Sequence, residues 1–310
     1  MNLKTDRKAT GIAGGASLGR PTGSLPIALV IFLILLPSAL DASEDPYFVT
    51  YSHHLEEPGN LEIAMNPLLA RPSDGKSSFG SWMEFEYGTK AWWTTEFYLE
   101  GQSTHREGTL FTGYRIENRF RPLMENHWIN PVLYFEFEHL NGASKTLQEV
   151  VGFDSQEDLR QPLAQTRREK EKEMELRLVL GSDFKGWNLS ENFIAEKNLS
   201  NAPWEFGYAI GLNRPLRLSA SALPCTFCRE NFRLGAEIYG GLGDWHRLTF
   251  NSTAHYVAPV VLWELNRGVT AKISPGFGLT GSSVPFLFRF GISFEIPGFG
   301  QRARQLFRQH

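Results

Sequence analysis

Charged side chains alternate with apolar ones along many stretches of the chain, and they are the groups that could do chemistry. Those expected to share one face are Glu84, Glu86, Glu96, Glu100, Arg115, Glu117, Arg119, Glu136, Glu138, Glu175, Arg177, Glu205, Arg233, Glu237, Lys272 and Arg289. Around one axis they would favour cations or polyhydroxylated solutes, because a narrow polar bore focuses the electric field. Alternatively, they pair across neighbouring strands and fill the bore with side chains, as Arg115 and Glu138 could do across one hairpin.

The case for catalysis in the sequence is thin. A lipid hydrolase built on a barrel wall needs a serine and a histidine on the same strand face. Ser252 and His255 are three positions apart, which places them on opposite faces of a regular strand. His53 and His54 are expected to be solvated, and the remaining histidines lack metal-ligand spacing. The sequence therefore predicts a protein that is not an enzyme and that has neither a cofactor nor a metal site.

Cys225 and Cys228 are the two cysteines of the chain. They lie in a connection between predicted strands, at residues 219–231. In an oxidising compartment we expect them to form a disulfide, with a redox-active dithiol as the alternative.

Strands must position the charged groups, because the alternation has a period of two. The pattern is clearest at 286–296, where Phe288, Phe290 and Ile292 share one parity with other apolar residues. This stretch has the ~9–11 residues that a tilted transmembrane strand needs. The twelve predicted strands are 61–66, 79–87, 93–100, 110–121, 133–138, 174–183, 187–199, 204–213, 232–239, 255–265, 269–279 and 286–296. Residues 255–265 are apolar on both parities, so their faces stay unassigned.

Two architectures fit this alternation, a soluble sandwich and a transmembrane barrel. Ten of the twelve predicted strands are longer than the ~5–6 residues usual in soluble sheets. Their number is even, and short connections such as 88–90 and 185–186 fall at one end while 141–172 and 240–252 fall at the other. These features favour an all-β protein, an antiparallel up-and-down transmembrane β-barrel of about 12 strands. It would span residues 60–296, with 141–172 as a long external loop.

The two ends of the chain have different compositions. Basic residues precede an apolar run at 25–36 and then small residues, which is the order of a secretory signal peptide. We expect residues 1–42 to be this signal, with a retained anchor helix as the alternative. Residues 43–59 then form an N-terminal periplasmic segment, and residues 297–310 form a basic C-terminal tail.

Several stretches resemble a known family. They are Met174–Arg177, Gly181–Leu189, Trp204–Gly211 and Leu234–Gly240. Their spacing of glycine, glutamate and aromatic residues is similar to that of the outer-membrane proteins named after the MetA pathway of phenol degradation. The resemblance implies a barrel in the outer membrane of a Gram-negative bacterium that serves transport, without catalytic residues to carry over. The basic tail departs from the terminal aromatic residue of many such barrels.

The sequence thus predicts an outer-membrane barrel that acts as a passive pore or uptake channel for small solutes. One alternative is a lipid hydrolase of the barrel wall, and another is a non-conducting structural barrel whose external loop binds a partner. The expected partners are outer-membrane lipid, the barrel-assembly machinery and an unidentified small solute. Without its signal the chain is acidic, which argues against a nucleic acid partner.

Overall fold

A computed structural model describes residues 45–74, 76–219, 225–265 and 268–308. The predicted signal peptide lies outside the described residues. Within them, none of the helices has both the length and the apolar character needed to cross a membrane.

The described chain forms one antiparallel sheet of thirteen strands. The strands are β1 (Leu61–Arg71), β2 (Ser78–Lys90), β3 (Trp93–Thr104), β4 (Gly108–Phe120), β5 (Asn130–Asn141), β6 (Lys170–Phe184), β7 (Trp187–Asn198), β8 (Trp204–Pro215), β9 (Phe232–Asp244), β10 (Arg247–Leu248), β11 (His255–Leu265), β12 (Val269–Gly278) and β13 (Phe286–Ile296). Pairing of β8 with β9 closes the sheet into a barrel, and β1 pairs with β13. Since β10 only extends β9 as a short hairpin, twelve strands make the wall. The predicted antiparallel barrel is confirmed.

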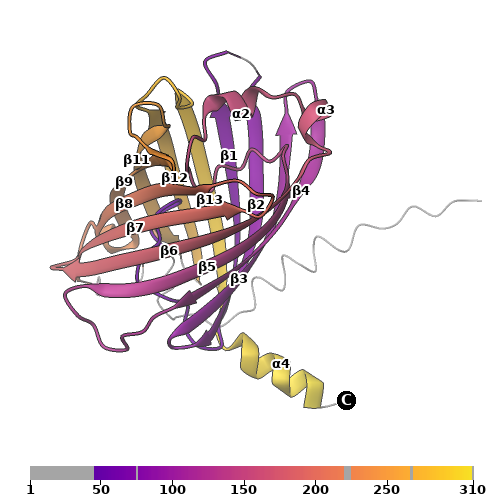
Figure 1. Cartoon of the computed structure of the whole chain (residues 1–310). Coiled ribbons are helices and arrows are strands. Elements are labelled where there is room, and N and C mark those ends of the chain that lie inside the picture. The colour runs from indigo at the N-terminus through magenta and orange to yellow at the C-terminus, as the bar shows by residue number, and fades with distance from the viewer. Residues whose placement is uncertain (1–44, 75, 220–224, 266–267, 309–310) are drawn as a thin grey trace, which may run out of the picture. The chain divides into compact units, whose positions relative to one another are not determined.

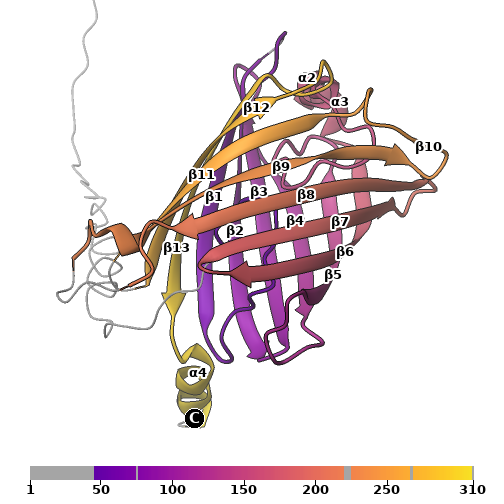
Figure 2. The same ribbon diagram turned by 90° about the vertical axis from the view of Figure 1, so that its left-hand side faces the viewer.

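The helices lie at the two ends of the barrel. Two short helices, α2 (Gln156–Arg160) and α3 (Leu163–Thr166), belong to the long loop between β5 and β6. The basic tail contains a third, α4 (Phe299–Arg308), and η1 (Arg229–Asn231) precedes β9. Figures 1 and 2 show α2 and α3 at one end and α4 at the other, beside the end of β13. We call the end with α2 and α3 the external end, and the end with α4 the periplasmic end.

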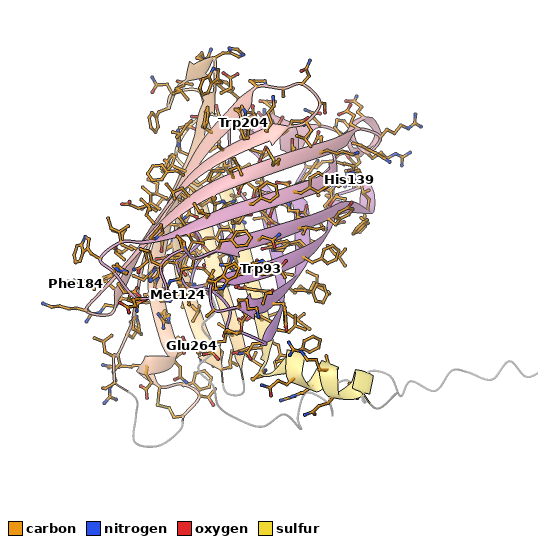
Figure 3. The ribbon with its side chains drawn as sticks, turned by 60° about the horizontal axis from the view of Figure 1, so that its bottom comes forward. Trp93, Met124, His139, Phe184, Trp204 and Glu264 are labelled. Atoms are coloured by element: carbon orange, nitrogen blue, oxygen red, sulfur yellow. A yellow bond between two sulfur atoms is a disulfide. The ribbon has the colours of Figure 1, made fainter. Side chains whose placement is uncertain are left out.

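The outer surface of the wall is apolar. On β13, Phe288, Phe290 and Ile292 point outward, whereas Leu287 and Arg289 alternate with them and are buried. Side chains project from the outer side of the strands around the barrel, with Phe184 at the periplasmic end of β6 (Figure 3). An apolar band facing outward and polar groups facing inward are the arrangement of a barrel in lipid.

The β11 faces, which the sequence leaves unassigned, follow from burial. Tyr256, Val260 and Leu262 are buried and point inward, although they are apolar or aromatic. Tyr256 belongs to a hydrophobic cluster that also includes Leu68 on β1 and Leu287 on β13. One sector of the lumen is therefore apolar, and this is why β11 shows no clean alternation.

Residues 45–60, which we name the N-terminal segment, overlap the periplasmic segment predicted at 43–59, and most of them are buried or half-buried inside the barrel, whereas Glu57 and Pro58 are exposed. Tyr47 is 2% exposed, and its hydroxyl donates to Oδ1 of Asn188 on β7 at 2.9 Å. The amide of Val49 donates to Glu237 on β9 at 2.9 Å. The segment is thus an internal plug.

The long loop between β5 and β6, residues 142–169, also enters the barrel. Lys145 is buried, and its Nζ donates to the carbonyl of Leu159 at 2.7 Å within the same loop. Glu149 reaches Arg115 on the barrel wall at 2.8 Å. We call this segment the external loop. It fills the external part of the lumen.

Candidate functional site

Arg115 on β4 is the centre of the charged part of the lumen. Its guanidinium lies 3.0 Å from both Glu136 and Glu138 on β5, and it also contacts Glu100 on β3. Glu149 of the external loop completes the group at 2.8 Å. All these groups are at least nine-tenths buried. A buried guanidinium with several carboxylates is stable because its five donors can each be satisfied.

Arg119 lies two inward positions further along β4 and points toward β3 and β2. It contacts Glu86 on β2, Glu96 on β3 and Glu117 on its own strand. The pairing expected between Arg115 and Glu138 across one hairpin is therefore present, whereas Arg119 pairs with β2, β3 and its own strand. The ring of Tyr51 from the N-terminal segment lies 5.0 Å from the Arg119 guanidinium. Its hydroxyl donates to Glu117 at 2.8 Å, so the plug takes part in this group.

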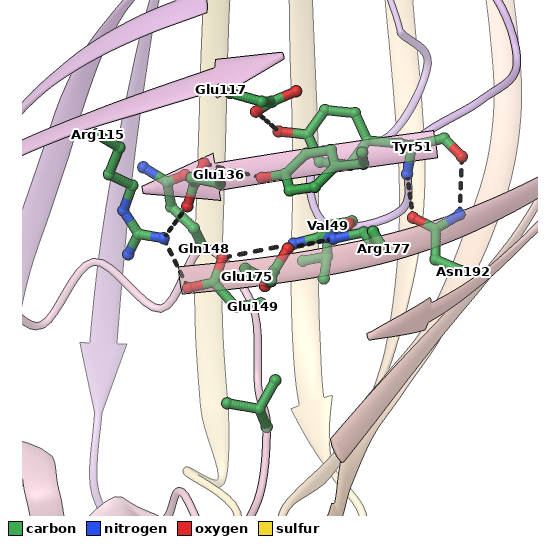
Figure 4. Close-up of polar contacts among 12 residues, drawn as sticks. Val49, Tyr51, Arg115, Glu117, Glu136, Gln148, Glu149, Glu175, Arg177 and Asn192 are labelled. Carbon is green, nitrogen blue, oxygen red and sulfur yellow. Dashed lines mark hydrogen bonds and ion pairs between the residues drawn. The ribbon is translucent and has the colours of Figure 1, made fainter. Parts of the chain in front are cut away.

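Arg177 on β6 joins both plugging segments (Figure 4). Its Nη1 donates to the carbonyl of Val49 in the N-terminal segment at 3.0 Å. Its Nη2 lies 3.6 Å from Glu149 of the external loop, and its Nε donates to Glu175 at 2.6 Å. One side chain of the wall therefore holds a segment from each end of the barrel.

Glu237 on β9 is the main anchor of the N-terminal segment. Its carboxylate accepts three backbone amides, from Phe48 at 3.0 Å, Val49 at 2.9 Å and Thr50 at 2.8 Å. From β12, Lys272 donates to the carbonyls of residues 45 and 47, each at 3.0 Å. Because one partner in each of these hydrogen bonds is a charged side chain, they are among the stronger hydrogen bonds.

The sixteen residues predicted to line the lumen can now be located. Glu84, Glu86, Glu205 and Arg233 are half-buried, and the other twelve are buried. The wall brings the groups around Arg115 and Arg119 together. Arg233 lies apart, paired at 3.1 Å with Glu264 at the periplasmic end of the wall.

Three asparagines contribute to the site, although the sequence singles out none of them for a role. Asn192 on β7 exchanges two hydrogen bonds with the backbone of Tyr51, at 2.7 and 2.9 Å. Asn188 and Asn213 both bond the hydroxyl of Tyr47. The available signal was the presence of uncharged amides at inward positions of β7 and β8, together with aromatic residues just after the predicted signal.

Two cavities lie in the barrel. A cavity of about 320 Å³ is lined by the external loop and by carboxylates such as Glu138, Glu173 and Glu196. A second, of about 340 Å³, is lined by Pro46 and His54 of the N-terminal segment and by the periplasmic ends of several strands. Along β6, Arg177 and its contact with Val49 lie between Glu173, which lines the first cavity, and Asp183, which lines the second. The plug therefore separates an acidic external cavity from a periplasmic one.

Burial changes the acidity of two carboxyls outside the strands. Burial raises the pKa of Asp154 in the external loop well above its usual range; a hydrogen bond from the Val151 amide opposes the rise, and the Glu205 charge adds to it. In the N-terminal segment, burial and then the nearby charge of Glu295 raise the pKa of Glu56 to about 7. Both carboxyls are therefore more readily protonated in the folded protein than in water.

The raised pKa of Glu56 predicts a pH-dependent plug. The segment seated in the barrel favours the protonated form of Glu56. The stabilisation that this carboxyl gives to the seated segment is therefore full below the ordinary pKa of a glutamate and is lost as the pH rises through about 7. We expect the fraction of open barrels in planar bilayers to rise between about pH 5 and about pH 8. Glu56→Gln should flatten this dependence, whereas Glu57→Gln, at an exposed position, should keep it. Equal pH profiles for the two variants would contradict the assignment.

The candidate hydrolase pair does not assemble in the described structure. His255 is buried, with Nε2 2.9 Å from Thr253 Oγ1 and Nδ1 3.1 Å from the Tyr208 hydroxyl. Ser252 is exposed, and its hydroxyl accepts from Arg247 at 2.8 Å. The two residues therefore have separate partners, and no observation supports a serine activated by this histidine.

The two cysteines form a disulfide in the structure, with 5.5 Å between their Cα atoms. The loop that it closes packs on β11. Trp263 Nε1 donates to the carbonyl of Thr226 at 2.9 Å, and the Phe227 ring lies 4.7 Å from the Trp263 ring. The disulfide is thus part of a periplasmic loop that contacts the wall.

Neither the protein-family models nor the curated protein sequences include a match to this chain. Among solved structures, an outer membrane channel from Pseudomonas putida F1 is 9% identical, with a TM-score of 0.50, and the match covers 82% of this chain and all of that one. The KdgM porin in complex with oligogalacturonate is 5% identical, with a TM-score of 0.44 over 75% and 98% of the two chains. LpxR from Salmonella typhimurium is 9% identical, with a TM-score of 0.38 over 76% and 99%. The first similarity agrees with the barrel fold, and at this identity it says nothing about the solute.

Proposed function

We propose that the protein is a passive pore or uptake channel for small solutes in the outer membrane of a Gram-negative bacterium. The observation that carries the proposal is the pair of cavities on either side of the N-terminal segment. The segment is held by hydrogen bonds and ion contacts, such as those of Glu237 and Arg177, and is not part of the wall. A passage closed by a separate piece of chain can open when that piece moves.

The solute class follows from the charge of the external cavity. Its lining includes Glu138, Glu149, Glu173, Glu196 and Glu205, whereas Arg115 is the single basic residue among the described residues that line it. Carboxylates concentrated at the entrance attract cations, and they also accept hydrogen bonds from hydroxyl groups. Small cations and polyhydroxylated solutes are therefore the proposed cargo.

Recording from the refolded chain in planar bilayers tests this proposal. We expect cation-selective openings, with a reversal potential in a salt gradient that moves toward zero in the double variant Glu173→Gln/Glu205→Gln. The control is Glu191→Gln, because this residue lies on the outer face of β7 beside Trp187. The absence of current both from the intact chain and from a chain without residues 45–58 would overturn the proposal.

The resemblance to the MetA-pathway proteins agrees with this function. We propose that this chain also serves transport. The partners that we propose are the lipid around the apolar outer face, the machinery that inserts the barrel and the unidentified solute. A docking barrel is less well supported, because the external loop turns residues such as Lys145 and Glu149 inward.

A further inference from the structure

Two adjacent histidines of the N-terminal segment converge on one carboxylate of the wall. His53 Nε2 lies 3.3 Å and His54 Nε2 3.1 Å from the same oxygen, Oδ2 of Asp183 at the periplasmic end of β6. The candidate ligand atoms of the three side chains all lie within 4.8 Å of one another. The expectation that both histidines are solvated is wrong for His53, which is fully buried.

These distances suit a transition metal. Two ligand atoms that are each about 2.0–2.1 Å from a tetrahedral zinc ion are separated by roughly 3.3 Å. Imidazole nitrogen and carboxylate oxygen are ligands that zinc and its neighbours in the first row accept. A nitrogen and an oxygen at 3.1–3.3 Å thus already have the separation that such an ion requires.

The surroundings hold the three groups in place. The other carboxylate oxygen of Asp183, Oδ1, accepts a hydrogen bond from Asn188 at 2.8 Å, which fixes the plane of the carboxylate. Partners of this kind orient metal ligands. His53 packs against Gly181, where a Cβ atom would lie only 2.1 Å from Nδ1. His53 Nδ1 has no hydrogen-bond partner in the described part of the chain, and Nε2 faces Asp183 Oδ2, the atom with which it would share the ion.

The site is also open to a metal on one side. The side chains of His54 and Asp183 are 39% and 42% exposed, and both line the periplasmic cavity. An ion can therefore enter from the periplasmic end and keep a water molecule in its remaining coordination position.

We propose that His53, His54 and Asp183 bind a divalent transition-metal ion of the zinc class, and that this ion fastens the N-terminal segment to β6. Two of the ligands belong to the plug and one to the wall, so the ion links parts of the chain that are 129 positions apart at their closest. Because ligand binding stabilises the state that binds, the ion should favour the seated plug. Metal binding itself does not depend on whether the barrel conducts.

The test uses the untagged, refolded chain after treatment with a chelator. Calorimetric titration with zinc chloride should give one ion per chain, and cobalt(II) should give the visible absorption of a tetrahedral nitrogen and oxygen site. His54→Gln and Asp183→Asn should each weaken binding by more than about tenfold. Gly181→Ala should also weaken it, because the added methyl group displaces the His53 ring while all three ligands remain.

His246→Gln is the matched control, because this histidine lies exposed in the loop after β9. It should leave the stoichiometry and affinity unchanged. Heat-modifiable mobility in electrophoresis would show that each variant still forms the barrel. Zinc should also slow amide exchange in residues 47–51 of the intact chain and not in Asp183→Asn. The absence of binding by the intact chain, or equal binding by the Asp183 and His246 variants, would overturn the metal site, and neither result bears on conduction.

Discussion

Phe290→Arg is expected to abolish insertion of the barrel into membranes. Phe290 lies in the middle of β13 and points outward, where it is 37% exposed. A lipid-facing arginine near the midplane costs roughly 2–4 kcal/mol, and β13 also pairs with both β12 and β1. The membrane fraction and the heat-modifiable electrophoretic mobility of the variant measure the loss.

Two control variants distinguish the effect of a charge on the outward face from the effect of any substitution at this point of β13. Phe290→Leu keeps an apolar side chain toward lipid and should assemble normally. Arg289→Phe changes the adjacent inward residue, which is 2% exposed and donates to the carbonyl of Leu147 in the external loop. It should loosen that loop and still yield an inserted barrel. If Arg289→Phe and Phe290→Arg failed to the same degree, the inward and outward faces would be assigned wrongly.

Glu237→Ala is expected to give the largest gain of conductance among single substitutions. It removes the carboxylate that accepts three amides of the N-terminal segment. Each hydrogen bond to a charged group contributes about 1.5–3 kcal/mol, so the ratio of open to closed barrels should rise by well over tenfold. Single-channel recording measures the open probability directly.

Deletion of residues 45–58 should reproduce the Glu237→Ala effect and exceed it. Glu205→Ala serves as the control, because Glu205 lines the external cavity, and no hydrogen bond or ion pair joins it to the described part of the N-terminal segment. It should alter ion selectivity and leave the open probability unchanged. If Glu237→Ala and the deletion both conducted no better than the intact chain, the N-terminal segment would not be the gate.

The strands of the wall could be predicted from the sequence because the two faces of a strand lie in different surroundings, and the alternation of its side chains reflects this difference. In β13, phenylalanine and isoleucine recur at every second position, and they face outward as that period requires. β11 resisted the same reasoning. Tyr256 and Val260 face inward, and Tyr256 packs in a cluster with residues of the N-terminal segment and the external loop, such as Val49 and Val150. Alternation reports the polarity on either side of a strand and not what fills the interior.

The candidate site was predictable only in part, for a related reason. The period of two identifies inward charges, but their partners depend on register and on segments distant in sequence. Arg119 pairs with Glu86 and Glu96 from β2 and β3, and among the described residues no ion pair joins it to β5, the other neighbour of its strand. Likewise His53 reads as solvent-exposed until the closed barrel brings Asp183 next to it. Contacts across the axis are set by the whole barrel.

The position of Arg177 has a thermodynamic consequence. One guanidinium contacts the carbonyl of Val49 on its periplasmic side and Glu149 on its external side. If the N-terminal segment or the external loop detaches, the Arg177 guanidinium interacts more with the segment that remains. The seating of the two segments is therefore energetically linked, and each changes the free energy of the other by the same amount. Arg177, together with the hydrophobic cluster that contains Val49 and Val150, therefore couples the seating of the N-terminal segment to that of the external loop.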